Sequence, residues 1–206
     1  MNYLAHLLLA KQGQGSAIGS LLADFTRIPS SRLSLHFEEE IASAIILHRR
    51  IDSFTDSHSD VASACHHLFR KYRHWSRVII DIAFDYFLSK HWSSYSDFPF
   101  DDFIRQSYSY LRDLPPGMPV RYQTFTQRLI SHDALRAYCG IEQLKIVFDR
   151  LQNRINSTVL ISGAWEDIVE HHEAIEYHFH SFFPQVISFA DGEKERMGSV
   201  TSGVKQ

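Results

Sequence analysis

The chain has 206 residues, of which 44% are apolar and 22% are charged, and its formal net charge is -3 with histidine counted as neutral. A chain of this size and composition is typical of one globular domain with a sizeable core. The acidic balance argues against a nucleic-acid binder, and no apolar run approaches the roughly 20 residues that a membrane span requires. The beginning lacks a basic leader and a small-residue cleavage site, which favours a cytoplasmic protein.

The first two predicted helices each carry one residue suited to metal binding. Residues 2–12 show apolar residues on one side, with His6 on or near that face. After a Gly-rich break, apolar residues at helical spacing predict a second helix over 18–25, which contains Asp24. A carboxylate in this apolar context is either an exposed flank or a group that a cation holds in the interior. The pattern leaves both interpretations open.

The segment 41–56, IASAIILHRRIDSFTD, predicts a helix with one buried stripe. His48 and Asp52 are four positions apart, so their side chains lie one above the other on the same helix face. This pair suits a metal ion, while Arg49 and Arg50 offer the rigid guanidinium donors that bind phosphate. The alternative is a solvated helix face with a His-Asp hydrogen bond.

A basic cluster begins in the last turn of the next predicted helix, 61–72, and continues beyond it. It consists of Arg70, Lys71, Arg73 and Arg77, interleaved with aromatic residues. Such clusters are usually solvated faces, but in an acidic protein this one is also suited to steering an acidic partner.

The most apolar predicted helix, 78–92, carries Asp81 and Asp85 four positions apart and His91 near its end. Two carboxylates stacked on one face repel each other, and a bound cation removes that repulsion. The two acids are therefore either a polar stripe on a buried helix or a second part of a metal site.

The remaining helical patterns cover 98–111, 121–138, 140–156 and 165–183, with Pro184 as the expected end of the last helix. No alternating strand pattern, glycine-rich phosphate loop or nucleophile elbow occurs. We expect an all-α protein with a single-domain helical bundle over 1–190 and a flexible tail over 191–206. The candidate acids and histidines come from separate helices, which is how helical bundles build a metal site in their core.

Four segments in this order and spacing resemble the acyl carrier protein phosphodiesterase family: NYLAH, GSLLADF, HRRID and DIAFDYFLSKHW. The resemblance runs from residue 1 to about Pro184. It implies an HD-domain-like fold and hydrolysis of the phosphodiester that joins 4'-phosphopantetheine to a serine of holo acyl carrier protein. It also implies a divalent metal, Mn²⁺ or Mg²⁺, with iron as an alternative. The acidic substrate would give the cluster Arg70, Lys71, Arg73 and Arg77 a docking role.

The resemblance implies site residues only where these motifs match. The candidate metal ligands are His6, Asp24, His48, Asp52, Asp81 and Asp85, and the candidate catalytic residues are Asp24, His48, Arg49, Arg50 and His91. The adjacent His-Asp pair that gives HD proteins their name is absent from these motifs. Two alternatives remain open: a related phosphohydrolase acting on a small nucleotide or phosphoester, and a helical module that binds an acidic partner without chemistry. The sequence does not determine the oligomeric state.

Overall fold

The computed structural model describes residues 1–155 and 158–202. Its α-helices are α1 (Tyr3–Leu9), α2 (Gln14–Leu22), α3 (Glu39–Ser57), α4 (Ser59–Tyr72), α5 (Trp75–Lys90), α6 (Phe100–Arg112), α7 (Val120–Ser131), α8 (Ile141–Gln152), α9 (Ala164–Glu170) and α10 (His172–Ser202). Short 3₁₀ turns are η1 (Ala23–Phe25), η2 (Ser30–Leu35), η3 (Trp92–Ser94) and η4 (Arg136–Tyr138). The described ranges contain no strand, which confirms the predicted all-α class. The HD-like detail stays a prediction.

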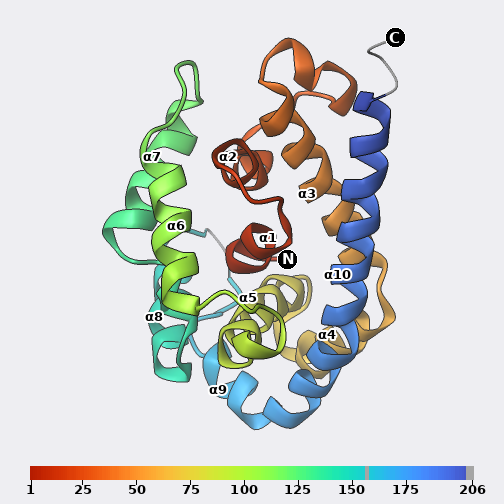
Figure 1. Ribbon diagram of the computed structural model, residues 1–206. Helices are drawn as coiled ribbons and strands as arrows, with labels where there is room; N and C mark the ends of the chain where they lie inside the picture. The colour runs from red at the N-terminus through yellow and green to blue at the C-terminus, as the bar shows by residue number, and fades with distance from the viewer. Residues whose placement is uncertain (156–157, 203–206) are drawn as a thin grey trace.

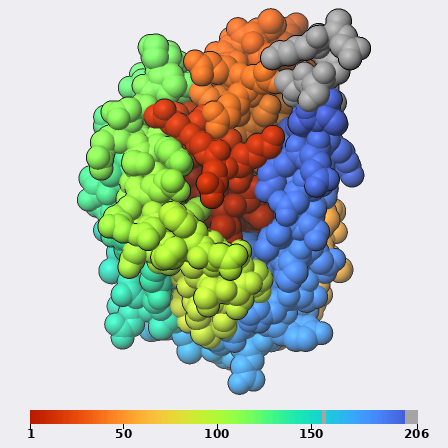
Figure 2. Space-filling model, in the orientation of Figure 1, coloured from red at the N-terminus to blue at the C-terminus, as the bar shows by residue number. Residues whose placement is uncertain are grey.

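The first two helices, α1 and α2, are short and lie in the middle of the bundle. Figure 1 shows α1 and α2 between the α6–α7 pair on one side and the α3–α10 pair on the other, with α4, α5 and α9 toward one end. In the space-filling view the red N-terminal segment is visible between the green and blue parts of the chain (Figure 2). Helix α1 therefore brings its residues close to several helices at once.

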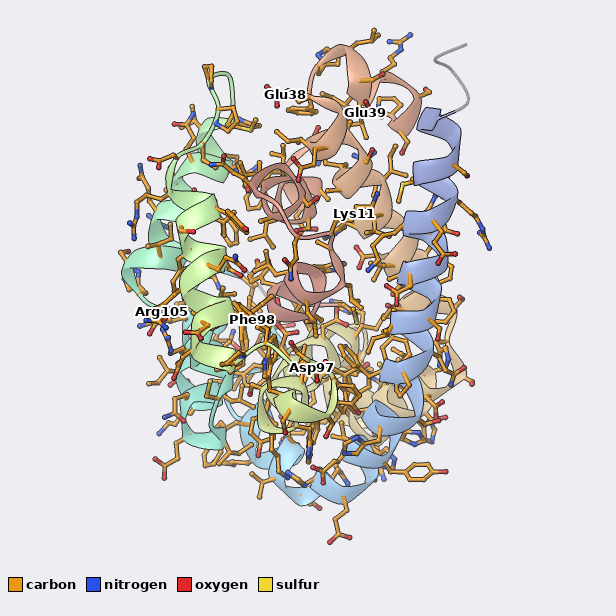
Figure 3. All side chains as sticks on the ribbon, viewed as in Figure 1. Lys11, Glu38, Glu39, Asp97, Phe98 and Arg105 are labelled. Atoms are coloured by element: carbon orange, nitrogen blue, oxygen red, sulfur yellow. The ribbon has the colours of Figure 1, made fainter. Side chains whose placement is uncertain are left out.

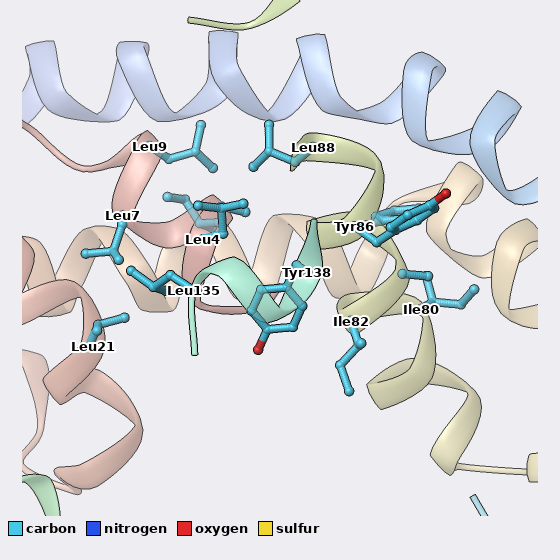
Figure 4. Packing of buried hydrophobic residues seen from close by; sticks show 14 of the residues in the cluster. Leu4, Leu7, Leu9, Leu21, Ile80, Ile82, Tyr86, Leu88, Leu135 and Tyr138 are labelled. Carbon is cyan, nitrogen blue, oxygen red and sulfur yellow. The ribbon is translucent and has the colours of Figure 1, made fainter. Parts of the chain in front are cut away.

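Helix α1 is apolar around most of its circumference, as expected for a helix inside a bundle. Leu4 is fully buried and Leu9 is 3% exposed. Figure 4 shows both on the side of α1 that faces the fully buried Leu88 of α5. Burial of large aliphatic side chains at this contact contributes about 1.5 to 3 kcal/mol each and fixes α1 against α5.

Helices α2 and α3 pack closely together at Gly19. A Cβ atom there would lie 2.4 Å from the carbonyl oxygen of Ile41 and 2.7 Å from the Cβ atom of Ala44. Only glycine permits so close an approach of one helix backbone to another. The approach places the main chain of Ser20 next to the side chain of His48, where the candidate site begins.

The C-terminal helix differs from the sequence prediction in two ways. The predicted helix 165–183 is divided at His171 into α9 and α10, and α10 then continues through Pro184 instead of ending there. Val186 and Ala190 are fully buried beyond the proline, so burial of this face offsets the hydrogen bond that proline removes. Of the expected flexible tail, residues 191–202 are helical and 203–206 lie outside the described residues.

Two further boundaries bear on the sequence predictions. Asp24 lies in the 3₁₀ turn η1 and not inside an α-helix, because α2 ends at Leu22. The predicted end of the eighth helix at residue 156 falls on a residue outside the described ranges, and α8 ends at Gln152. Among the residues that the structure describes, no helix is both long enough and apolar enough to span a bilayer.

Candidate metal centre

The centre is built on the His48–Asp52 pair of α3. Nε2 of His48 lies 2.9 Å from Oδ2 of Asp52, one helical turn further on. On the other side of the ring, Nδ1 of His48 lies 2.6 Å from the carbonyl oxygen of Ser20 in α2. Because a carbonyl oxygen only accepts, this contact assigns the proton to Nδ1 and leaves Nε2 available as a ligand when the ring is neutral.

His6 of α1 and Asp24 of η1 complete the cluster from two other elements. Nε2 of His6 lies 3.0 Å from Oδ1 of Asp52, and its ring stacks on that of His48 with 3.7 Å between centroids. Oδ1 of Asp24 lies 3.3 Å from Nε2 of His48. The structure therefore brings together four of the predicted residues, which come from three separate segments of the chain.

The cluster is buried at its imidazoles and open at its carboxylates. The side chains of His6 and His48 are 1% and 4% exposed, while Asp52 and Asp24 are 37% and 49% exposed. A site of this shape holds its nitrogen ligands firmly and lets a substrate reach its oxygen ligands. The sequence left two options for Asp24, an exposed flank or a carboxylate held in the interior, and its 49% exposure favours the exposed flank.

Burial and charge shift the pKa values of this cluster in opposite directions. Burial and the neighbouring His48 lower the pKa of His6 to about 4. Burial also lowers the pKa of His48, but hydrogen bonds with Asp24 and Asp52 outweigh it and raise that pKa to about 9. Burial raises the pKa of Asp52, whereas its hydrogen bonds with both imidazoles hold it well below the usual range. At neutral pH the metal-free cluster therefore contains His48 as a positively charged imidazolium, with both ring nitrogens protonated, and His6 as a neutral imidazole.

The donor set fits a divalent cation. One ligand atom from each of His6, His48 and Asp52 lies within 4.8 Å of the others. Imidazole and carboxylate groups are ligands that first-row divalent metals accept in proteins. Nδ1 of His6 is buried and has no hydrogen-bond partner among the described residues, so its ring is oriented by stacking and by what Nε2 binds. These three residues would hold the ion, with Asp24 beside them.

Asp81 and Asp85 take different positions although both lie on α5. The amino group of Met1 lies 3.2 Å from Asp52 and 3.5 Å from Asp81, so Asp81 borders the cluster through a shared ammonium. Asp85 is fully buried and accepts hydrogen bonds from the backbone N–H groups of Leu4 and Ala5, at 2.8 and 3.1 Å. In this structure Asp85 thus anchors the beginning of α1 at Leu4 and Ala5, the two residues that directly precede His6.

The two arginines between His48 and Asp52 contact other parts of the protein. Arg49 donates to the carbonyl oxygens of Thr26 and Ile28 at 3.0 and 2.8 Å, which ties α3 to the loop after Asp24. Arg50 forms an ion pair with Glu193 of α10, whose side chain is 4% exposed. The structure gives each guanidinium a positioning contact, and their predicted role in phosphate binding stays a prediction.

His91 lies away from the other candidates. It follows α5 and its Nε2 lies 2.6 Å from Oε1 of Glu176 on α10. Sequence reasoning did not select Glu176, although its four-residue spacing to His180 is the same signal that identified His48 and Asp52. It also missed Ser20, because the group that orients His48 is a backbone carbonyl with no signature in the sequence.

A cavity of about 330 Å³ lies elsewhere, between α2, α3 and α10. Lys11 and Glu39, both labelled in Figure 3, are among its lining residues, whereas none of the predicted site residues lines it. The candidate centre is therefore separate from this cavity.

Comparison with known proteins places the chain in a family. A sequence profile described as "Acyl carrier protein phosphodiesterase" matches residues 1–186. Proteins named acyl carrier protein phosphodiesterase from Salmonella agona (strain SL483) and Salmonella newport (strain SL254) are each 31% identical to the chain over 191 residues, which make up 92% of this chain and 97% of each relative. No solved structure matches the chain. The chain belongs to the acyl carrier protein phosphodiesterase family.

Proposed function

We propose that the protein hydrolyses the phosphodiester between 4'-phosphopantetheine and a serine of holo acyl carrier protein. Water adds to phosphorus and the bond to the serine oxygen breaks, which yields apo acyl carrier protein and free 4'-phosphopantetheine. The family match over residues 1–186 is the observation that carries this proposal. The cluster of imidazoles and carboxylates supports it, because phosphoryl transfer depends on positioning and charge stabilisation.

A divalent cation, Mn²⁺ or Mg²⁺, would be held by His6, His48 and Asp52. When bound, it would act as a Lewis acid on the phosphoryl oxygens and favour attack by water at neutral pH. The protein's own contribution is orientation: the backbone carbonyl of Ser20 would fix the tautomer of His48, and α1 stacks the ring of His6 on that of His48. Asp24, half-exposed beside His48, would accept a proton from the attacking water.

We propose that the basic cluster docks an acidic partner, and one of its residues, Arg77, lies near the candidate metal centre. Arg77 pairs with Asp56 at 2.9 Å, and Asp56 lies one turn after Asp52 on α3. Lys71 contacts Asp167, whereas Arg70 and Arg73 are exposed and form no ion pair with any described residue. We assign Arg70 and Arg73 to the docking surface, where charges accelerate the encounter with an acidic carrier protein.

The proposal is tested by the mass of holo acyl carrier protein after incubation with the purified protein and manganese. The expected result is loss of the phosphopantetheine mass, which a chelator prevents. A carrier protein of unchanged mass with every metal tried would overturn the proposed reaction. Hydrolysis of a small phosphodiester with no action on the carrier would favour the related phosphohydrolase instead.

A further inference from the structure

A second group of metal-binding side chains lies where α5 meets α10. His91, Glu176 and His180 each offer one ligand atom, and these atoms lie within 4.8 Å of one another. The first follows the last turn of α5, and the other two are one turn apart on α10. The group therefore joins α5 and α10, two helices that are far apart in the sequence.

The geometry points to a zinc site formed by these three residues. Two imidazoles and one carboxylate, with a water as the fourth ligand, are a set that zinc uses in proteins. The Glu176 oxygen and Nε2 of His91 are 2.6 Å apart, and ligands of one tetrahedral zinc are about 3.3 Å apart at bond lengths near 2.0 Å. A small outward movement of two partly exposed side chains provides this separation.

The surrounding residues orient the ligands. Oη of Tyr95 lies 2.8 Å from Nδ1 of His180, and the tautomer that donates Nδ1–H to Tyr95 leaves Nε2 for the metal. The rings of His91 and His180 meet edge to face with 4.5 Å between centroids. Contacts of this kind hold both imidazoles toward the same point.

In the metal-free protein the ammonium group of Lys90 occupies the position of a cation beside Glu176. Its Nζ lies 2.8 Å from Oε1 of Glu176 and 3.3 Å from Nε2 of His172. The Lys90 side chain is 38% exposed and swings into solvent when zinc replaces it.

This competition predicts opposite effects for two substitutions. His180→Phe keeps an aromatic ring and removes a ligand nitrogen, so zinc binding at this site is lost. Lys90→Met removes the competing ammonium, so zinc binds here roughly tenfold more tightly. His66→Gln, an exposed histidine of α4 outside the group, is the matched control and leaves binding unchanged.

The experiment titrates zinc alone into chelator-stripped protein, with calorimetry for stoichiometry and thermal melting for stabilisation. The parent should bind one more equivalent than His180→Phe, because the His6–His48–Asp52 cluster is present in both. Zinc should also raise the melting temperature of the parent by more than that of His180→Phe. Equal stoichiometry and affinity in these two proteins, or no tightening in Lys90→Met, would show that the group is only an ion-pair network.

Discussion

Asp52 is the residue on which the candidate metal centre converges. Its two carboxylate oxygens face different imidazoles, Oδ1 toward His6 and Oδ2 toward His48. The ammonium group of Met1 approaches the same carboxylate. A residue that faces two rings and one cation holds the cluster together electrostatically.

We expect Asp52→Asn to reduce phosphodiesterase activity by at least roughly 100-fold, because it removes the charged ligand while keeping the side-chain volume. In the parent, manganese at 100 times its dissociation constant should add about 2.7 kcal/mol of stability, or about 5 to 11 °C in melting temperature. The variant should lose most of this shift. Asp97→Asn, at an exposed site outside the cluster, is the control that keeps both properties.

The shifted pKa values of His6 and His48 predict that the free energy of unfolding of the metal-free protein has a bell-shaped dependence on pH. The pKa of His48 is raised from 6.5 to about 9, so its stabilisation is complete below about pH 6.5 and is lost as the pH rises toward 9. The pKa of His6 is lowered to about 4, so stability is also lost as the pH falls from about 6.5 toward 4.

Urea unfolding in the presence of a chelator measures this profile. The loss on the alkaline side amounts to about 3 to 4 kcal/mol at most, since one pKa unit corresponds to about 1.4 kcal/mol. His48→Gln should flatten the alkaline side and also weaken the acid side, because His48 contributes to the lowered pKa of His6. An alkaline decline of the same size in this variant would contradict the assignment.

At the scale of the elements, the contact between α2 and α3 determines whether His48 is oriented. Gly19→Ala would place a Cβ atom 2.4 Å from the carbonyl oxygen of Ile41, so α2 must move away from α3. We expect a loss of about 1 to 3 kcal/mol in the free energy of unfolding and weaker manganese binding. Both are measured by urea unfolding and calorimetry.

Gly192→Ala is the control for this substitution. Gly192 lies in α10 with no atom within 4 Å of an added Cβ, so alanine there should stabilise the helix by about 0.5 to 1 kcal/mol. Equal effects of the two substitutions would show that the close approach at Gly19 is not required.

Asp85 has two candidate roles: it anchors α1 to α5 through the backbone of Leu4 and Ala5, or it binds the metal. Asn at this position accepts one of the two backbone N–H groups and turns its own amide donor toward the other. Because the side chain is fully buried, Asp85→Asn should lower the free energy of unfolding by about 1 to 3 kcal/mol. The manganese-dependent rise in melting temperature should remain. Loss of that rise with unchanged metal-free stability would instead make Asp85 a metal ligand, as the sequence predicted.

At the scale of the whole molecule, the basic cluster bears on how the protein meets an acidic carrier protein. We expect Arg70→Glu with Arg73→Glu to raise KM on the order of tenfold at low salt and to change kcat little, because surface charges act mainly on the encounter. Steady-state kinetics at two salt concentrations measure the effect, which should shrink at high salt. Lys145→Glu on α8 is the control, because it also replaces a positive charge by a negative one, at an exposed site outside the cluster.

Unchanged kinetics of the double variant at low salt would remove Arg70 and Arg73 from the docking surface. A fall in kcat of the same size as the rise in KM would mean that the substitutions disturb the centre itself, through Arg77 and Asp56. The Lys145→Glu result shows which part of any effect comes from net charge alone.

The sequence by itself determined the helical class, most helix positions and the His48–Asp52 pair. The predicted helix 41–56 corresponds to α3 at Glu39–Ser57, because helix periodicity and the four-residue spacing of side chains are local properties. The same motifs also identified His6 and Asp24 as candidates. The family follows from these segments as well, and the comparisons confirm it.

Only the tertiary structure decided which candidates meet. Asp81 and Asp85 have the same spacing as His48 and Asp52, yet one borders the cluster and the other binds the backbone of α1. Contacts of Arg50 and His91 with α10 were equally invisible, and α10 itself passes through the proline that was expected to end it. The physical reason is that a side chain's partner depends on how distant helix faces pack to bury apolar surface, and spacing within one helix carries no information about that packing.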